Sequence, residues 1–304
     1  MLNVTEFRVG NYEPHPSLYF ASGWPPFCRN LQKLSLSIRV QNIKYLGLES
    51  MALCNLEELN LALRFPDESP ASAEIILTTI APFISRLNAS LRTLRITTLL
   101  DLDNSPFFDL LRFFPKLHNL NLSIGISRNS DSESPITRFV QRHTDTLRSL
   151  VYMSHYSSAQ SERSLLRVSN IFQFRLLHLR SLTLHLHVDP TAGAALMPCI
   201  SPFVETLTSI DIRHVCLRAK DLAFVTSAFL RSPGTLKSAG FGIDVLSPGV
   251  LDVLAKNLSG LENLTLLFSD LGEHGLDEEA PTDRSWFYVS SDRIPFFFSS
   301  APRL

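Results

Sequence analysis

Apolar residues recur along the chain in a short pattern, Leu-x-x-Leu-x-Leu, whose last two apolar positions alternate with polar ones. This alternation is typical of a β-strand that buries one face. Ten clean or degenerate copies occur, about 29 residues apart on average. The first apolar residues of the copies, here called anchors, lie near positions 4, 31, 56, 91, 117, 147, 179, 207, 236 and 261. A period of this length predicts a repeat architecture.

The segments between the strand copies change to a helical period. In 74–87 the apolar residues fall on one helical stripe, and 219–230 repeats this pattern. The members of the first stripe are Ile76, Ile80, Phe83, Ile84 and Leu87. We expect Pro82 to kink or interrupt this helix, because proline lacks a backbone N–H. Ser-Pro pairs, in which serine caps the helix and proline fits its first turn, predict further helix starts at 105–106, 134–135 and 247–248.

Each repeat therefore predicts a strand, a turn, a helix and a second turn, and such a unit can bury its apolar face only against a neighbour. The pattern resembles the leucine-rich repeat family in its longer, helix-bearing variety. The resemblance implies an α/β fold, a leucine-rich repeat solenoid (horseshoe) with a parallel β-sheet on the concave face and helices on the convex face. It covers nearly the whole chain, so 1–304 is predicted to be a single leucine-rich repeat solenoid of about ten irregular repeats.

The two ends of the repeat array have features of their own. Residues 270–283, after the last clear strand copy, are rich in Asp, Glu and Gly and predict a solvated acidic loop. The final Pro-Arg-Leu at 302–304 echoes the Pro-Lys-Leu at 115–117, which opens a good repeat, and the first copy begins at Val4. Because a solenoid needs polar caps, we expect the chain to be truncated at both ends relative to a longer gene product.

The composition of the chain excludes some classes of binding partner. The chain has 304 residues, 51 of them leucine, and a formal net charge of −1, which gives no general attraction to nucleic acid or to anionic membranes. It contains no uncharged apolar run of roughly 18 residues and no secretory signal. The four cysteines form no Cys-x-x-Cys pair. We therefore expect a cytoplasmic or nuclear protein with no nucleic-acid or membrane partner, no cofactor and no metal.

Motifs of known catalytic chemistry are missing from the sequence. It has no Gly-x-Ser-x-Gly elbow, no phosphate-binding Gly-x-x-x-x-Gly-Lys loop and no His-Glu-x-x-His helix. His185 and His187 fall on one strand face with His178 nearby, yet no carboxylate or thiolate is placed by the sequence to complete a zinc site. We expect exposed structural histidines, no catalytic residues and a protein that is not an enzyme.

Strand alternation places the residues two, four and six positions after each anchor on the concave face. Most of them are small and polar. A mixed patch in adjacent repeats is the candidate site for a protein partner on this face, and it consists of Val151, Met153, His185, Asp211 and Arg213. The alternative is a solvated sheet face that merely tolerates Ser, Thr and Asn.

The irregular repeat spacing and the Leu-Arg-Ser-Leu runs at 147–150 and 179–182 look most like the repeat region of fungal F-box/leucine-rich repeat proteins. This resemblance implies the substrate-recognition part of an F-box-type ubiquitin ligase subunit. No F-box helix of the Leu-Pro-x-Glu-Leu type is found at the N-terminus, so a ubiquitin-ligase adaptor would bind only if an F-box lies outside this chain. The alternative is a GTPase-activating or enzyme-inhibitor leucine-rich repeat protein.

Overall fold

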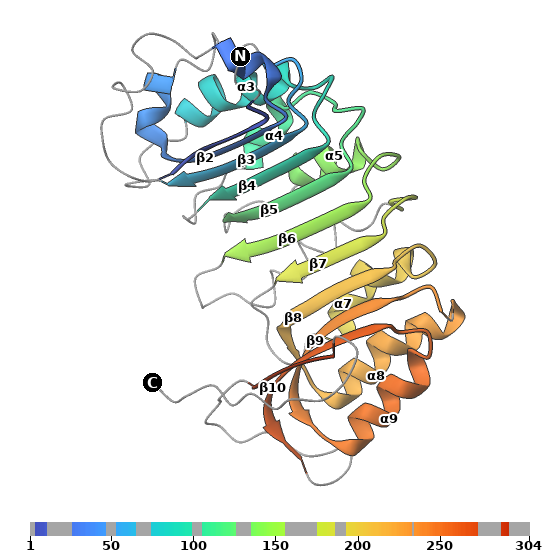
Figure 1. The fold of residues 1–304 in the computed structure, drawn as a ribbon. Helices are drawn as coiled ribbons and strands as arrows, with labels where there is room; N and C mark the ends of the chain where they lie inside the picture. Colours follow the sequence, from blue (N-terminus) through green and yellow to red (C-terminus); the bar gives the residue numbers. More distant parts are fainter. Residues whose placement is uncertain are drawn as a thin grey trace. The chain divides into compact units, whose positions relative to one another are not determined.

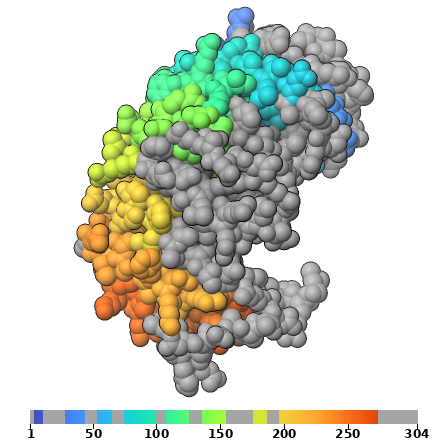
Figure 2. Space-filling model, turned by 180° about the vertical axis from the view of Figure 1, so that it is seen from behind, coloured from blue at the N-terminus to red at the C-terminus, as the bar shows by residue number. Residues whose placement is uncertain are grey.

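The computed structural model describes ten segments of the chain, which are coloured by residue number (Figure 1; Figure 2). The segments are 4–10, 26–46, 53–64, 74–98, 105–125, 135–155, 175–185, 193–232, 234–272 and 287–291. The chain divides into two compact units, Met1–Ser157 (unit 1) and Ser158–Leu304 (unit 2). Each unit is described by itself.

Six parallel strands pair in chain order in unit 1 (Figure 1). They are β1 Glu6–Val9, β2 Lys33–Arg39, β3 Glu58–Arg64, β4 Thr93–Thr98, β5 Asn119–Gly125 and β6 Ser149–His155. Each begins two residues after an anchor. Their register aligns one leucine from each of β2 to β6 in a buried ladder, which consists of Leu34, Leu59, Leu94, Leu120 and Leu150. Burial of each such side chain contributes about 2 kcal/mol, so the repeated leucines drive the stacking of the repeats.

Short helices connect these strands and lie on one face of the sheet (Figure 1). They are the 3-10 helices η1 Pro26–Asn30 and η2 Val40–Leu46, the π-helix η4 Ile76–Ile80, and the α-helices α3 Ala81–Arg86, α4 Ser105–Leu110 and α5 Pro135–Gln141. The helix predicted at 74–87 is confirmed, and its whole apolar stripe is buried. Because Pro82 has no N–H to donate to the carbonyl of Thr78, a regular α-helical ladder cannot pass this point. The helix is accordingly π-helical over Ile76–Ile80 and α-helical over Ala81–Arg86.

Unit 2 repeats the same plan, with one strand of five residues followed by three strands of nine residues. Its strands β7 Ser181–His185, β8 Ser209–Leu217, β9 Ser238–Leu246 and β10 Asn263–Leu271 are parallel and pair in chain order. Its helices are α7 Gly193–Ile200, η6 Ser201–Phe203, α8 Ala219–Ser227, η7 Ala228–Arg231 and α9 Pro248–Asn257. The predicted serine cap is confirmed at α9, where the side chain of Ser247 accepts the N–H of Val250.

A hydrogen-bond fork repeats at the start of the strands. The carbonyl directly after an anchor accepts two N–H groups from the next repeat, so that Glu57 O binds Arg92 N (2.8 Å) and Thr93 N (2.9 Å). Arg92 O binds His118 N (2.9 Å) and Asn119 N (3.0 Å) in the same way. The fork places the residue that follows each anchor directly before its strand. These residues form a row across the N-terminal ends of the strands, about 4.8 Å apart.

The end of unit 2 differs from the predicted pattern. A strand that the repeat pattern does not predict, β11 Phe287–Ser291, pairs antiparallel with β10 on the edge opposite β9. Of the predicted acidic loop at 270–283, Asp270 and Leu271 belong to β10, and 273–283 lies outside the described residues.

The predicted fold class is confirmed within each unit, since both are α/β with parallel strands in chain order and connecting helices on one face. The horseshoe shape and the single solenoid over 1–304 stay predictions. In the part of the chain that the structure describes, no helix is long and apolar enough to cross a membrane.

Candidate protein-binding site

A bulge in β8 is the main irregularity among the described strands of unit 2, whose face opposite the described helices is here called the open face. The register with β9 pairs Ile212 with Phe241 and then Cys216 with Gly242. Three residues of β8, 213–215, therefore stand between consecutive residues of β9. Such bulges disturb the strand ladder and re-aim side chains. Here Val215 is buried while His214 is exposed.

Two glycines of β9 make room for this bulge. A Cβ on Gly242 would lie 2.2 Å from the carbonyl oxygen of Arg213 and 2.7 Å from that of Val215. A Cβ on Gly240 would lie 2.9 Å from Oδ1 of Asp211 and 3.1 Å from Cγ of Arg213. The backbone of the bulge thus lies against Gly242, and the side chains that precede it lie against Gly240. Both glycines were expected to be outward positions of the sheet, yet both are buried, because the bulge covers them.

Asp211 and Arg213 form a bidentate ion pair at the base of the bulge. Nε of Arg213 donates to Oδ1 of Asp211 (2.9 Å), and Nη2 donates to Oδ2 (2.7 Å). The backbone N–H of Arg213 donates to the same carboxylate (3.2 Å). Two-pronged pairing of this kind fixes the orientation of both side chains. The pair is only partly exposed, at 32% for Arg213 and 22% for Asp211, so it presents a pre-oriented charged surface.

Two imidazoles lie beside the ion pair. The rings of His185 on β7 and His214 in the bulge have centroids 4.0 Å apart and planes inclined by 46°. Among the described residues, no group of three or more His, Cys, Asp or Glu side chains could hold a metal ion. His187, which the sequence places on the same strand face as His185, lies outside the described residues. We call His185, Asp211, Arg213 and His214 the bulge patch.

The electrostatics of the bulge patch depend on Arg213. Burial by itself would raise the pKa of Asp211, but the hydrogen bonds and positive charge of Arg213, together with His185, hold this pKa below its usual value. Arg213 and His185 therefore favour the ionised form of Asp211, whereas burial disfavours it.

We expect Arg213→Ala to reverse the direction of this shift and to raise the pKa of Asp211 above its usual value. The reason is that burial remains after the hydrogen bonds and positive charge of Arg213 are gone. Carboxyl carbon shifts measured by NMR over a pH titration report the pKa directly. Arg231→Ala, which removes an exposed cation from η7 in the same unit, is the matched control and should leave Asp211 unchanged. A pKa for Asp211 that stays low in Arg213→Ala would contradict the assignment.

The structure brings together three of the five predicted site residues, His185, Asp211 and Arg213, in unit 2. Val151 and Met153 lie on β6 in unit 1, half-buried at alternate positions. The role of all five in binding stays a prediction. His214 and the bulge that exposes it were not predicted from the sequence. The usable signal was the pair of glycines in the neighbouring strand, since glycine inside a strand often marks a bulge or a close backbone approach.

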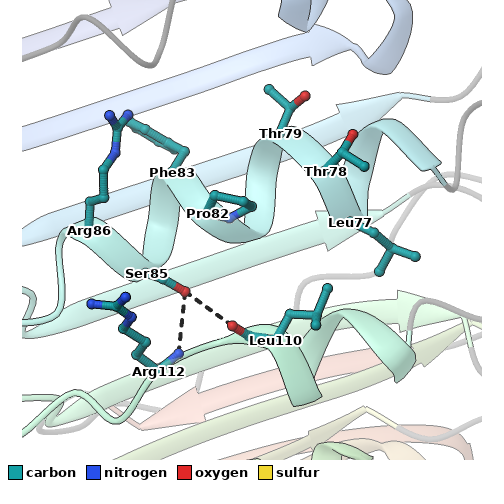
Figure 3. A pocket seen from close by; sticks show the side chains of 9 residues that line it. All are labelled: Leu77, Thr78, Thr79, Pro82, Phe83, Ser85, Arg86, Leu110 and Arg112. Atoms are coloured by element: carbon teal, nitrogen blue, oxygen red, sulfur yellow. Dashed lines mark hydrogen bonds between the residues drawn. The ribbon is translucent and has the colours of Figure 1, made fainter.

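A separate hollow of about 570 Å³ lies on the helix side of unit 1, between the helix η4–α3 and α4 (Figure 3). Leu77, Pro82 and Leu110 line it together with the cations Arg86 and Arg112. Ser85 ties its two walls together, because its hydroxyl donates to Leu110 O and accepts the N–H of Arg112, both at 3.3 Å. None of the described residues that line this hollow is Asp, Glu, His or Cys.

No protein-family model matches the chain, and no curated protein matches it. Among solved structures it is similar to a chain in the crystal structure of the Rad7 and Elc1 complex in yeast, with a TM-score of 0.40 and 15% sequence identity. The similarity covers 77% of this chain and 68% of that chain. The functional proposal that follows rests on the residues of this chain.

Proposed function

We propose that this protein is a non-enzymatic repeat scaffold that binds a protein partner on the open face of unit 2, through the bulge patch. The observation that carries the proposal is the fixed Asp211–Arg213 pair on a bulge that fits against Gly240 and Gly242. A side chain that is already held in place loses little conformational entropy on binding. Arginine is also enriched among the residues that dominate the energy of protein interfaces.

The repeats support this proposal by placing the patch on a rigid base. The open-face residues of β7 and β8 are half-buried at alternate positions, while the residues between them are buried against the helices. A partner would therefore meet a surface with fixed backbone positions. A preorganised surface with charges of both signs favours binding of a specific polar partner over nonspecific binding. The chain's net charge of −1 is consistent with selectivity through a few placed charges.

The finer proposal is that the scaffold is the substrate-recognition part of an F-box-type ubiquitin ligase subunit, working in the cytoplasm or the nucleus. It rests on the resemblance of the Leu-x-x-Leu-x-Leu copies and their irregular spacing to fungal F-box/leucine-rich repeat proteins. Under this proposal the bulge patch holds the target, and an F-box outside this chain binds the ligase adaptor. Adaptor and cullin captured together with the full gene product would support the finer proposal.

We expect a patch variant to lose partners that the unchanged protein captures. The experiment is affinity capture with mass spectrometry on the unchanged chain, on the patch variant Arg213→Ala, and on the control Lys256→Ala, which removes an exposed cation from α9. Loss of a partly buried charged anchor costs an interface about 2 kcal/mol or more, so captured partners should fall by roughly tenfold or more in the patch variant only. Identical partner lists for all three proteins would refute the proposed surface.

A further inference from the structure

Positively charged residues cluster at the N-terminal ends of the strands in unit 1, here called the N-terminal edge of the sheet. The fork described above sets Arg92, His118 and Arg148 at the start of three consecutive strands, β4, β5 and β6. Adjacent positions in this row are about 4.8 Å apart along the edge. Lys116 precedes His118 by two residues and is exposed. We call Arg92, Lys116, His118 and Arg148 the basic edge.

Arg92 and Arg148 both act on the pKa of His118, which lies between them in the row. Burial lowers this pKa below its usual value, and the positive charges of Arg148 and Arg92 lower it further. Two guanidinium groups from the neighbouring strands on either side therefore reach the same imidazole. The field at this edge favours a negative charge and disfavours a further positive one.

Two carboxylates, Glu57 and the exposed Asp145 three residues before Arg148, offset part of the charge of the three cations. Oε2 of Glu57 lies 3.5 Å from Nε of Arg92, with both side chains about half exposed. Within the described residues, Lys116 and Arg148 form no ion pair. The corresponding edge of unit 2 is different, because there Lys237 pairs with Glu262 at 3.0 Å.

A polar hollow of about 460 Å³ opens beside the basic edge. Arg92 and Lys116 line it, and among the described residues that line it Glu57 is the one carboxylate. Its remaining lining residues are uncharged and mostly polar, and they include Asn30, Gln32, Asn55 and Ser90. These amides and hydroxyls can bind the backbone and side chains of an extended peptide, while the cations bind its carboxylates.

We propose that the basic edge and its hollow form a second binding surface, for an acidic segment of a protein partner. Asp or Glu side chains of that segment would lie against Lys116 and Arg148, and its backbone would enter the hollow. A nucleic acid is a poorer fit, because Glu57 stands in the hollow and none of the described residues that line it is aromatic and able to stack on a base. The surface belongs to unit 1, so this proposal does not depend on the bulge patch of unit 2.

The test uses the whole chain and a fluorescent oligoglutamate peptide, with binding followed by anisotropy. We expect Lys116→Ala with Arg148→Ala to weaken binding by roughly tenfold, and added salt to weaken it in the unchanged protein. The matched control is Arg180→Ala with Lys237→Ala, which removes two cations at the corresponding edge of unit 2 and should leave the affinity unchanged. A melting temperature for each variant shows whether it is folded.

Glu57→Gln is a second test, in which the affinity for oligoglutamate should increase. It removes the carboxylate of the hollow and frees Arg92, so affinity for oligoglutamate should rise by roughly threefold. Failure of oligoglutamate to bind at low salt, or equal weakening by the unit 1 and unit 2 variants, would overturn the proposal. Equal or tighter binding of single-stranded DNA would also overturn it, because the edge would then be a general polyanion site.

Discussion

Replacing Gly242 with alanine is expected to destabilise the protein by at least about 3 kcal/mol, more than a typical single substitution. The added Cβ would lie 2.2 Å from the backbone oxygen of Arg213 and 2.7 Å from that of Val215. Both obstacles are backbone atoms, so rotation of a side chain cannot relieve the clash. The bulge would have to lift off β9, and the position of the Asp211–Arg213 pair would change with it. Urea denaturation of the purified variant measures the loss.

Two other glycines serve as matched controls for this prediction. Gly10→Ala should be close to neutral, because nothing lies within 4 Å of the added Cβ. Gly240→Ala should cost less than Gly242→Ala, since its nearest atoms belong to the side chains of Asp211 and Arg213, at 2.9 Å and 3.1 Å. If Gly242→Ala were as stable as Gly10→Ala, the bulge would not lie against β9 as described.

The second large effect concerns His143, a fully buried histidine in the turn that follows α5. The backbone N–H of Phe114 donates to Nε2 (3.0 Å), and Nδ1 lies 2.7 Å from the carbonyl oxygen of Phe139. A carbonyl can only accept, so Nδ1 must carry the proton and Nε2 must be bare. The ring packs against Phe113 and Phe139, with centroids 5.1 Å and 4.6 Å away. If the ring took up a second proton, at Nε2, this N–H and the backbone N–H of Phe114 would be two donors facing each other in an apolar site.

These surroundings lower the pKa of His143 to about 4, mainly through burial and also through the charge of Arg142, although the bond to Phe139 opposes the shift. In the unfolded chain the ordinary value of about 6.5 applies. Between these two values the unfolded state binds more protons, so the free energy of unfolding rises with pH. We expect His143 to contribute about 3 kcal/mol at pH 7 that is lost as the pH falls from about 6.5 to about 4.

Urea denaturation at a series of pH values checks this prediction. His143→Gln should be less stable at pH 7 and should show a much shallower dependence on pH in this range. His118 contributes a slope of the same sign, because its pKa is also lowered, so a small slope should remain. His178→Gln, at an exposed position, should keep the slope of the unchanged protein. An unchanged slope in His143→Gln would show that the buried site is described wrongly.

Sequence periodicity predicted most of the fold because one physical rule repeats. An apolar residue at each anchor, followed by alternating apolar positions, can be satisfied only by stacked strands with one buried face. Even the degenerate copy at 236–241 follows the rule, since Ala239 and Phe241 are both buried in register with Ile210 and Ile212. The helix at 74–87, its interruption at Pro82 and the serine cap of α9 followed from local chemistry alone.

The parts that escaped prediction depend on contacts between distant residues. The bulge in β8 forms because Gly240 and Gly242, about thirty residues later, leave space for it. The strand β11 has no leucine pattern and gains its place by antiparallel pairing with β10. The basic edge was also hidden, because Arg92, His118 and Arg148 are far apart in sequence and meet only through the strand register.

The claim at the centre of this account is that a protein partner binds the open face of unit 2. Photo-crosslinking tests it most directly, with a crosslinking residue at Thr183, which pairs with Asp211 in the register, or at the exposed Lys256 on α9. We predict that the partner captured by the unchanged protein crosslinks from position 183 and not from position 256, and that Arg213→Ala abolishes this product. A partner that crosslinks from position 256 and not from position 183 would contradict the account.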